Sequence, residues 1–143
     1  PSTLNYQPGT ILITELFPNP AGRDKGVEFV ELYNPHPTLI QLDNWKLGAK
    51  SKRRLKDLSI APQSYLVIRT VTLRNSADTI ELIASDSALI DQVSYPDPKE
   101  GKSWSRERRV VGAQEIYDFC WFWKNKVSKY PEKLCFLLLY LKS

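Results

Sequence analysis

Short apolar segments separated by turn residues run along most of this sequence, and they constrain its fold more than any other feature. Ile, Val, Leu, Tyr and Thr dominate these segments, while Pro, Gly, Asn and Asp dominate the loops between them. β-branched and aromatic residues favour strands, and the loop residues favour turns because of their backbone conformations. The pattern therefore predicts strands at residues 10–17, 27–34, 38–42, 45–48, 64–70, 78–84 and 88–95.

The succession of strands also predicts the fold class. No convincing amphipathic helix interrupts it, and this many short strands within about 100 residues is typical of an antiparallel sandwich or a small barrel. The chain has 143 residues, of which 42% are hydrophobic and 25% are charged, a composition typical of one soluble globular domain rather than of a disordered chain. We therefore expect an all-β antiparallel fold.

The C-terminal quarter differs in character from the rest of the chain. QEIYDFCWFW, residues 114–123, would place Tyr117 and three other aromatic side chains on one face of a final strand. LCFLLLYL, residues 134–141, is too short to span a bilayer and favours packing on the sandwich or on a neighbouring domain. A membrane anchor that continues beyond the chain is the alternative. Cys120 and Cys135 are compatible with a disulfide or with two buried thiols.

Motifs for catalysis are absent from the sequence. The only histidine, His36, lies between two prolines, and no GxSxG motif supplies a nucleophilic serine. Phosphate-binding loop motifs are missing too, and the six glycines are scattered at turns. With one histidine and no CxxC pair, a structural zinc site is not expected. The sequence therefore predicts no enzymatic activity, no cofactor and no small-molecule substrate.

The run KSKRRLK, residues 50–56, is the best candidate for a binding surface. It carries five positive charges in seven residues, whereas the net charge of the whole chain is +4, so the positive charge is local. Such a run would bind DNA phosphates in a salt-sensitive way, without reading the sequence. The alternative is a solvated loop or a charged sheet edge that prevents aggregation. The candidate nucleic-acid or anion-binding residues are Lys50, Lys52, Arg53, Arg54 and Lys56.

The segment GVEFVELYNP, residues 26–35, raises the question of a carboxylate pair. Glu28 and Glu31 would lie on opposite faces of the predicted strand, so joint action on one substrate atom is disfavoured. We expect Glu31 to be held by Arg106 or by turn amides, and Glu28 to meet solvent or a divalent cation. The alternative to purely structural roles is a cation site whose candidate ligands are Glu15, Asp24 and Glu28.

Taken in order, six segments resemble the lamin tail domain. They are ILITELFPNPAG, GVEFVELYNP, IQLDNWKLG, IAPQSYLVI, LRNSADTIELIA and LIDQVSYPDPKEGKSWSR, and they cover roughly residues 9–107. The resemblance implies an immunoglobulin-like β-sandwich, with Trp45 in the core and the SWSR segment, residues 103–106, closing a sheet beside the first strands. The matching positions, which the resemblance assigns mostly to the fold, are Glu15, Glu28, Glu31, Asn34, Trp45, Ser103, Trp104 and Arg106.

The resemblance also implies a function. Lamin tail domains are not catalytic: in animals they form the globular tail of nuclear lamins, which binds chromatin, and bacterial members occur in secreted or surface proteins. The motifs of this chain look closer to the bacterial type. We therefore expect a non-catalytic interaction or adhesion module of a secreted or cell-surface protein, with an extracytoplasmic location. A nuclear location, as in a lamin, is the alternative.

The resemblance, the start at Pro1 and the lack of Met indicate a segment of a longer protein. We expect the sandwich to occupy residues 9–112 and a C-terminal extension to occupy 113–143. The expected partners are other domains of the same polypeptide or another protein, with DNA as the alternative partner. A membrane is expected only if the apolar end continues into an anchor.

Overall fold

The computed structural model describes residues 6–22 and 27–123, except for the side chains of 108–111 and 114–123. Within these residues the chain forms strands and no helix, hence no helix that is long and apolar enough to cross a membrane. The strands are β1 (Leu12–Phe17), β2 (Phe29–Tyr33), β3 (Ile40–Gln41), β4 (Lys46–Gly48), β5 (Lys52–Arg54), β6 (Ser59–Ile60), β7 (Tyr65–Ile68), β8 (Asp78–Ile83), β9 (Leu89–Tyr95), β10 (Lys102–Val111) and β11 (Gln114–Trp123).

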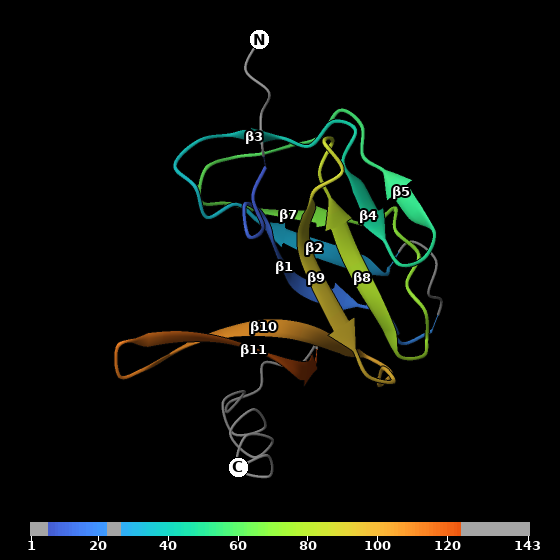
Figure 1. The fold of residues 1–143 in the computed structure, drawn as a ribbon. Helices are drawn as coiled ribbons and strands as arrows, with labels where there is room; N and C mark the ends of the chain where they lie inside the picture. Colours follow the sequence, from blue (N-terminus) through green and yellow to red (C-terminus); the bar gives the residue numbers. More distant parts are fainter. Residues whose placement is uncertain (1–5, 23–26, 124–143) are drawn as a thin grey trace.

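The strands form two facing antiparallel sheets. One sheet has five strands in the order β11-β10-β1-β2-β7, and the other has four in the order β5-β4-β8-β9. β3 pairs with β6 in a small two-stranded sheet. In Figure 1, β8 and β9 lie in front of β1 and β2 as the second layer of a sandwich. The fold is therefore the all-β antiparallel sandwich that the strand pattern predicted.

Aliphatic side chains around Trp45 fill the space between the sheets. Trp45 is fully buried, where the resemblance placed it, and the ring of Tyr6 packs edge-on against it with ring centroids 4.8 Å apart. Burial of a large apolar side chain stabilises the fold by about 1.5–3 kcal/mol. The other large, fully buried side chains come from both sheets, from β6 and from adjoining loops: Ile11, Ile13, Leu16, Val30, Leu32, Leu42, Leu47, Ile60, Ile80, Leu82 and Ile90.

A β-bulge interrupts the alternation of β1. Glu15 pairs with Glu31, and Ile13 pairs with the next residue of β2, so Thr14 is the extra residue. Ile13 and Leu16 therefore point into the core, while Thr14 and Glu15 between them both line a surface cleft. A bulge re-aims side chains in this way because two residues on one strand oppose a single residue on its partner.

All seven strands predicted from the apolar pattern form, each somewhat shorter than predicted. Two further strands, β5 and β6, occupy segments in which no strand was predicted. The final strand predicted at 114–123 is β11, which pairs with β10 along its whole length. Leu16 of β1 lies opposite Trp104 of β10, so the SWSR segment closes the five-stranded sheet beside β1. The rest of the predicted extension, including Cys135, lies outside the described residues, as does the side chain of Cys120.

Candidate functional site

The basic run forms an edge strand rather than a solvated loop. Asn44, which has a φ of 66°, donates its N–H to the Leu55 carbonyl (3.0 Å), and the Leu55 N–H donates to the Trp45 carbonyl (2.7 Å). These contacts form a β-bulge whose first residue is left-handed, a conformation that Asn tolerates better than most residues. The bulge sets the register between β4 and β5, in which Gly48 lies opposite Lys52.

This register sorts the basic side chains onto two faces of the four-stranded sheet. Lys46 lies opposite Arg54, and Leu47 lies opposite Arg53. Because Leu47 is fully buried, Arg53 lies on the face that is directed toward the other sheet. Lys46 and Arg54 lie on the outer face, and Lys52 shares that face with them. Alternation along β5 therefore separates Arg53 from its two neighbours.

Gly48 allows Lys52 to form an ion pair across β4. Lys52, Gly48 and Glu81 lie in one row across three strands. Because Gly48 has no side chain, the Lys52 ammonium reaches over it to within 3.9 Å of the Glu81 carboxylate. Gly48 has a φ of 148°, and a Cβ at this position would lie 2.7 Å from the Ser51 carbonyl oxygen. The row therefore requires glycine at its centre.

A cleft of about 860 Å³, which we call the β5 cleft, opens beside β5 on the side of Arg53. Its second wall belongs to the segment between β7 and β8, which runs along the same side of the sandwich as β5 in Figure 1. The apolar residues Leu47 and Val71 line this cleft, together with the basic residues Lys50, Lys52, Arg53 and Arg74. The β5 cleft thus combines an apolar lining with several cations.

Tyr95 holds the wall of the β5 cleft that contains Arg74. Its hydroxyl accepts a hydrogen bond from the Arg74 N–H (3.1 Å) and donates one to the Arg74 carbonyl (2.9 Å). Burial, together with the nearby Asp78 carboxylate, raises the pKa of Tyr95 to about 12. The hydroxyl therefore stays protonated at neutral pH and keeps both hydrogen bonds. The Arg74 side chain is 74% exposed, and its ion pair with Asp78 is long at 3.9 Å.

Glu28 holds the same wall, contrary to the expectation that it meets solvent or a cation. It is only 8% exposed, and its carboxylate accepts a hydrogen bond from the Leu73 N–H at 3.5 Å. Glu28 directly precedes β2 and lies two residues before Val30, which is fully buried, so the chain is directed into the core on this side. The expectation for Glu28 was therefore wrong. The sequence could not reveal this contact, because Leu73 lies 45 residues away from Glu28 and the two residues meet only in the folded chain.

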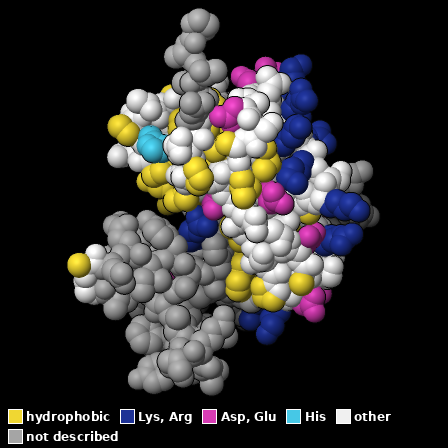
Figure 2. Space-filling model, viewed as in Figure 1, with side chains coloured by type: hydrophobic (Ala, Val, Ile, Leu, Met, Phe, Trp, Pro, Cys, Tyr) yellow, Lys and Arg dark blue, Asp and Glu magenta, His cyan; other side chains and the backbone are white. Residues whose placement is uncertain are grey.

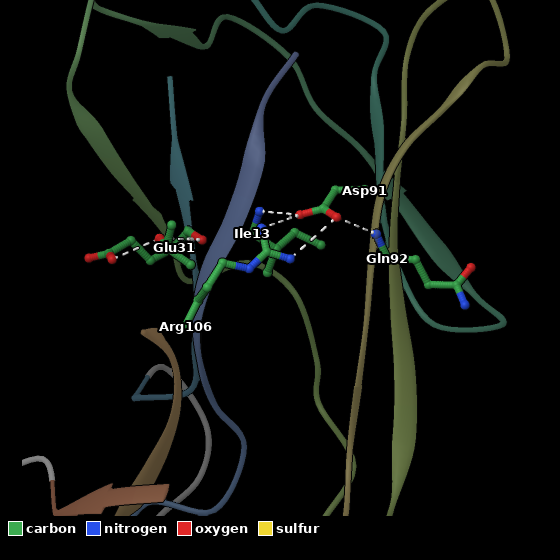
Figure 3. A network of polar contacts seen from close by, with 6 residues as sticks. Ile13, Glu31, Asp91, Gln92 and Arg106 are labelled. Carbon is green, nitrogen blue, oxygen red and sulfur yellow. Dashed lines mark hydrogen bonds and ion pairs between the residues drawn. The ribbon is translucent and has the colours of Figure 1, made fainter. Parts of the chain in front are cut away.

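Arg106 and Asp91 form a largely buried ion pair between the two sheets (Figure 3). The Arg106 guanidinium lies 3.1 Å from the Asp91 carboxylate, and the two side chains are 13% and 14% exposed. The same carboxylate accepts hydrogen bonds from the backbone N–H groups of Ile13 (2.7 Å) and Gln92 (2.9 Å). Asp91 on β9 thereby connects the four-stranded sheet to β1 and β10. Hydrogen bonds of this number offset the desolvation of a buried carboxylate.

Glu31 contacts Thr14, a partner that the sequence did not predict. The Thr14 hydroxyl donates a hydrogen bond to the Glu31 carboxylate at 2.9 Å. In Figure 3 this carboxylate points away from the Arg106 guanidinium, which binds Asp91. The bulge in β1 explains the contact, because it turns the Thr14 hydroxyl toward β2. Thr14, Glu15 and Glu31 line a small surface cleft of about 260 Å³.

Three further positions of the motif make contacts within the fold. Asn34 is fully buried, and its side-chain amide donates to three backbone carbonyls at 2.8–3.1 Å. Ser103 is 1% exposed, and the Trp104 indole N–H donates to the Ser94 carbonyl at 3.2 Å. Such contacts tie loops and strands together, and burial leaves the polar groups of Asn34 and Ser103 little access to a ligand.

The predicted cation site does not assemble from the residues that can be placed. Glu28 points into the core, whereas Glu15 lines the small outer cleft. In the described part of the chain, no three side chains of His, Cys, Asp or Glu form a group that could hold a metal ion. Asp24 lies outside the described residues, so its part in such a site stays a prediction.

The basic surface is larger than the sequence run that predicted it. Lys46 joins it through its register opposite Arg54, and Arg74 joins it from the other wall of the β5 cleft. Strand pairing could have indicated Lys46, but nothing local in the sequence connects Arg74 with β5. Figure 2 shows Lys and Arg side chains gathered along the side of the molecule that carries β5. The basic surface comprises Lys46, Lys50, Lys52, Arg53, Arg54, Lys56 and Arg74.

Comparison with known proteins gives one match. A family model described as the lamin tail domain matches residues 5–97, which is more than half of the chain and includes β1 through β9. No curated protein and no solved structure matches the chain. The match ends before β10, and it includes every strand that lines the β5 cleft.

Proposed function

Because the chain belongs to the lamin tail domain family of immunoglobulin-like domains, we propose that it is a non-catalytic interaction module of a larger protein. In this proposal the basic surface holds an acidic partner protein. The observation that carries the proposal is the gathering of seven basic residues on one side of the sandwich, all of them exposed except the half-buried Lys52. Concentrated charge of this kind attracts an oppositely charged surface and orients it.

Binding to poly-glutamate tests this proposal, because the polymer presents carboxylates in the way that an acidic protein segment does. We expect the whole chain to bind it with an affinity that falls as salt rises, since screening weakens exposed charge pairs. Reversal of Arg53 and Arg54 to Glu should abolish most of this binding. Lys52 is left unchanged because its ion pair with Glu81 supports the strand.

The matched control is Lys99→Glu, compared with Arg54→Glu, because both reverse one exposed charge and change the net charge by the same amount. We expect this control to bind poly-glutamate nearly as well as the wild type. Equal loss in the two single variants would show that net charge alone controls binding, and the proposal would be wrong. Hydrolysis of phosphodiester, glycoside or peptide substrates by the pure chain would contradict the non-catalytic part.

Binding of duplex DNA is the second candidate, and the pair formed by Lys46 and Arg54 favours it. These exposed side chains lie directly opposite each other on adjacent strands, where like charges repel and destabilise the sheet. A phosphate between them would remove that repulsion. Reversal of both to Glu should weaken duplex binding. It should also reduce the slope of the logarithm of the binding constant against the logarithm of the salt concentration by about one for each lost phosphate contact. Unchanged binding would contradict this candidate.

A further inference from the structure

The β5 cleft lies between an edge strand and a wall that is held in place. β5 is the last strand of its sheet, so its outer side pairs with no other strand of the described residues. The facing wall is fixed at two consecutive residues, Leu73 by the Glu28 carboxylate and Arg74 by the Tyr95 hydroxyl. A volume of about 860 Å³ lies within the usual range for ligand pockets, which is roughly 300–1,000 Å³. An open edge beside a fixed wall is the arrangement to which peptides add as strands.

The backbone of β5 has hydrogen-bonding groups directed outward from the sheet. Leu55 donates its N–H to the Trp45 carbonyl, which makes this a hydrogen-bonded pair of the ladder. Such pairs alternate with non-bonded pairs along antiparallel strands, so Arg53 is bonded to β4 while Lys52 and Arg54 are not. The N–H and C=O groups of Lys52 and Arg54 therefore point away from β4, at the spacing that an added strand requires.

The charges of the β5 cleft select an acidic occupant. Four basic residues line the cleft, Lys50, Lys52, Arg53 and Arg74, and Asp78 is the acidic residue among the lining residues. Asp78 lies 3.9 Å from Arg74, whose side chain is 74% exposed. An ion pair that is this exposed contributes little to stability. Carboxylates on alternate residues of an added strand would all face the same side of β5 as Arg53 and would meet the cations of the cleft there.

We infer that the β5 cleft binds an extended acidic segment of a partner protein, which adds to β5 as a further strand. Its inward carboxylates contact Arg53 and Arg74, and its backbone bonds to Lys52 and Arg54. This inference rests on the proposed function, because it specifies the conformation of the partner at the same basic surface. Duplex DNA matches the cleft less well, since Leu47 and Val71 in its lining offer no hydrogen bond to a phosphate.

A labelled peptide that alternates glutamate with threonine tests the inference, because all its glutamates share one face when it is extended. We expect the whole chain to bind it, as measured by fluorescence anisotropy. Arg53→Glu should weaken binding by about tenfold or more, and Arg53→Gln should weaken it less. Lys99→Glu, which reverses an exposed charge outside the basic surface, should stay within about threefold of the wild type. Melting temperatures identify any variant that fails to fold.

Hydrogen exchange of single amides distinguishes strand addition from simple charge attraction. The bound peptide should slow exchange of the Lys52 and Arg54 amides, which point outward in the free chain. An isomeric peptide with its glutamates in one block has the same charge but cannot place them all on one face. We expect it to bind more weakly and to leave both amides unprotected.

The outcomes separate this inference from the proposed function. The chain could bind poly-glutamate while the alternating peptide fails to protect the Lys52 and Arg54 amides. That result would overturn strand addition and would still support the proposed interaction module. Failure of both ligands to bind would overturn both, with Arg53 then serving only to guard the sheet edge. If duplex DNA displaces the peptide, and Arg53→Glu weakens DNA binding as much as it weakens peptide binding, the cleft binds nucleic acid and the inference is wrong.

Discussion

At the scale of single residues, the Asp91–Arg106 ion pair is the contact between the sheets whose loss we expect to be most harmful. Asp91→Ala removes the carboxylate that lies 3.1 Å from a guanidinium that is 13% exposed, and it leaves the Ile13 N–H without its acceptor. Removal of one partner of a buried pair lowers stability by roughly 3–5 kcal/mol. Urea denaturation followed by circular dichroism measures this loss as a change in the unfolding midpoint.

Two further variants show whether the ion pair itself is responsible. The double variant with Arg106→Ala should be less destabilised than the sum of the single variants, because it removes the buried guanidinium as well. Glu100→Ala, a change at an exposed carboxylate, should alter stability by no more than about 0.5 kcal/mol. A similarly small effect for Asp91→Ala would show that the pair does not hold the sheets together.

The carboxylates of β2 show what the sequence could predict about single residues. Alternation correctly placed Glu28 and Glu31 on opposite faces, because a strand fixes side-chain direction whatever its surroundings. It could not identify their partners. Leu73 reaches Glu28 from a distant segment, and Thr14 reaches Glu31 through a bulge that the apolar pattern does not reveal. Long-range contacts and register irregularities decide such partners.

At the scale of elements, Gly48 decides whether β4 and β5 can form their hairpin. We expect Gly48→Ala to destabilise the chain by roughly 1–3 kcal/mol, because the backbone is strained for any other residue and the new Cβ would overlap the Ser51 carbonyl. The Lys52–Glu81 ion pair, which crosses this glycine, should weaken with it. The change in the midpoint of urea denaturation measures the effect.

Gly112→Ala is the matched control for this element. Gly112 also has a positive φ, of 65°, but an added Cβ there would meet nothing within 4 Å. The Gly112→Ala variant therefore measures the backbone strain alone, which is about 1–2 kcal/mol for a left-handed residue. A smaller loss for Gly48→Ala than for Gly112→Ala would show that the contact with Ser51 is relieved by a shift of the turn.

The predicted elements differ from the observed ones where packing gives no signal. The seven apolar strands could be found because each buries alternate residues against the core, which leaves a period of two in the sequence. β5 consists of Lys52, Arg53 and Arg54 and shows no apolar alternation, because an edge strand need not bury a face. Its basic character was visible in the sequence, but its strand conformation and its sorting onto two faces were not.

At the scale of the whole molecule, the fold class followed from the sequence and the β5 cleft did not. The strand pattern and the family resemblance both pointed to a sandwich, since many short strands must bury one face against another layer. The cleft depends on which edges of the two layers lie on the same side. That arrangement brings Arg74 opposite Arg53, a distance of 21 residues along the chain, through the order of the strands alone.

The stability of the whole molecule at alkaline pH should depend on Tyr95. Its pKa is raised from 10.0 to about 12 in the folded chain, so above pH 10 the unfolded state loses a proton that the folded state keeps. The free energy of unfolding should therefore fall by up to about 1.4 kcal/mol per pH unit between pH 10 and 12 because of this one group. Tyr95→Phe should be less stable near neutral pH, because it lacks both hydrogen bonds to Arg74, but it should not share this fall. Urea denaturation of both proteins from pH 8 to pH 12 should therefore give curves that converge as the pH rises. Parallel curves would show that the Tyr95 hydroxyl ionises as it does in the unfolded chain, and that burial does not hold it protonated.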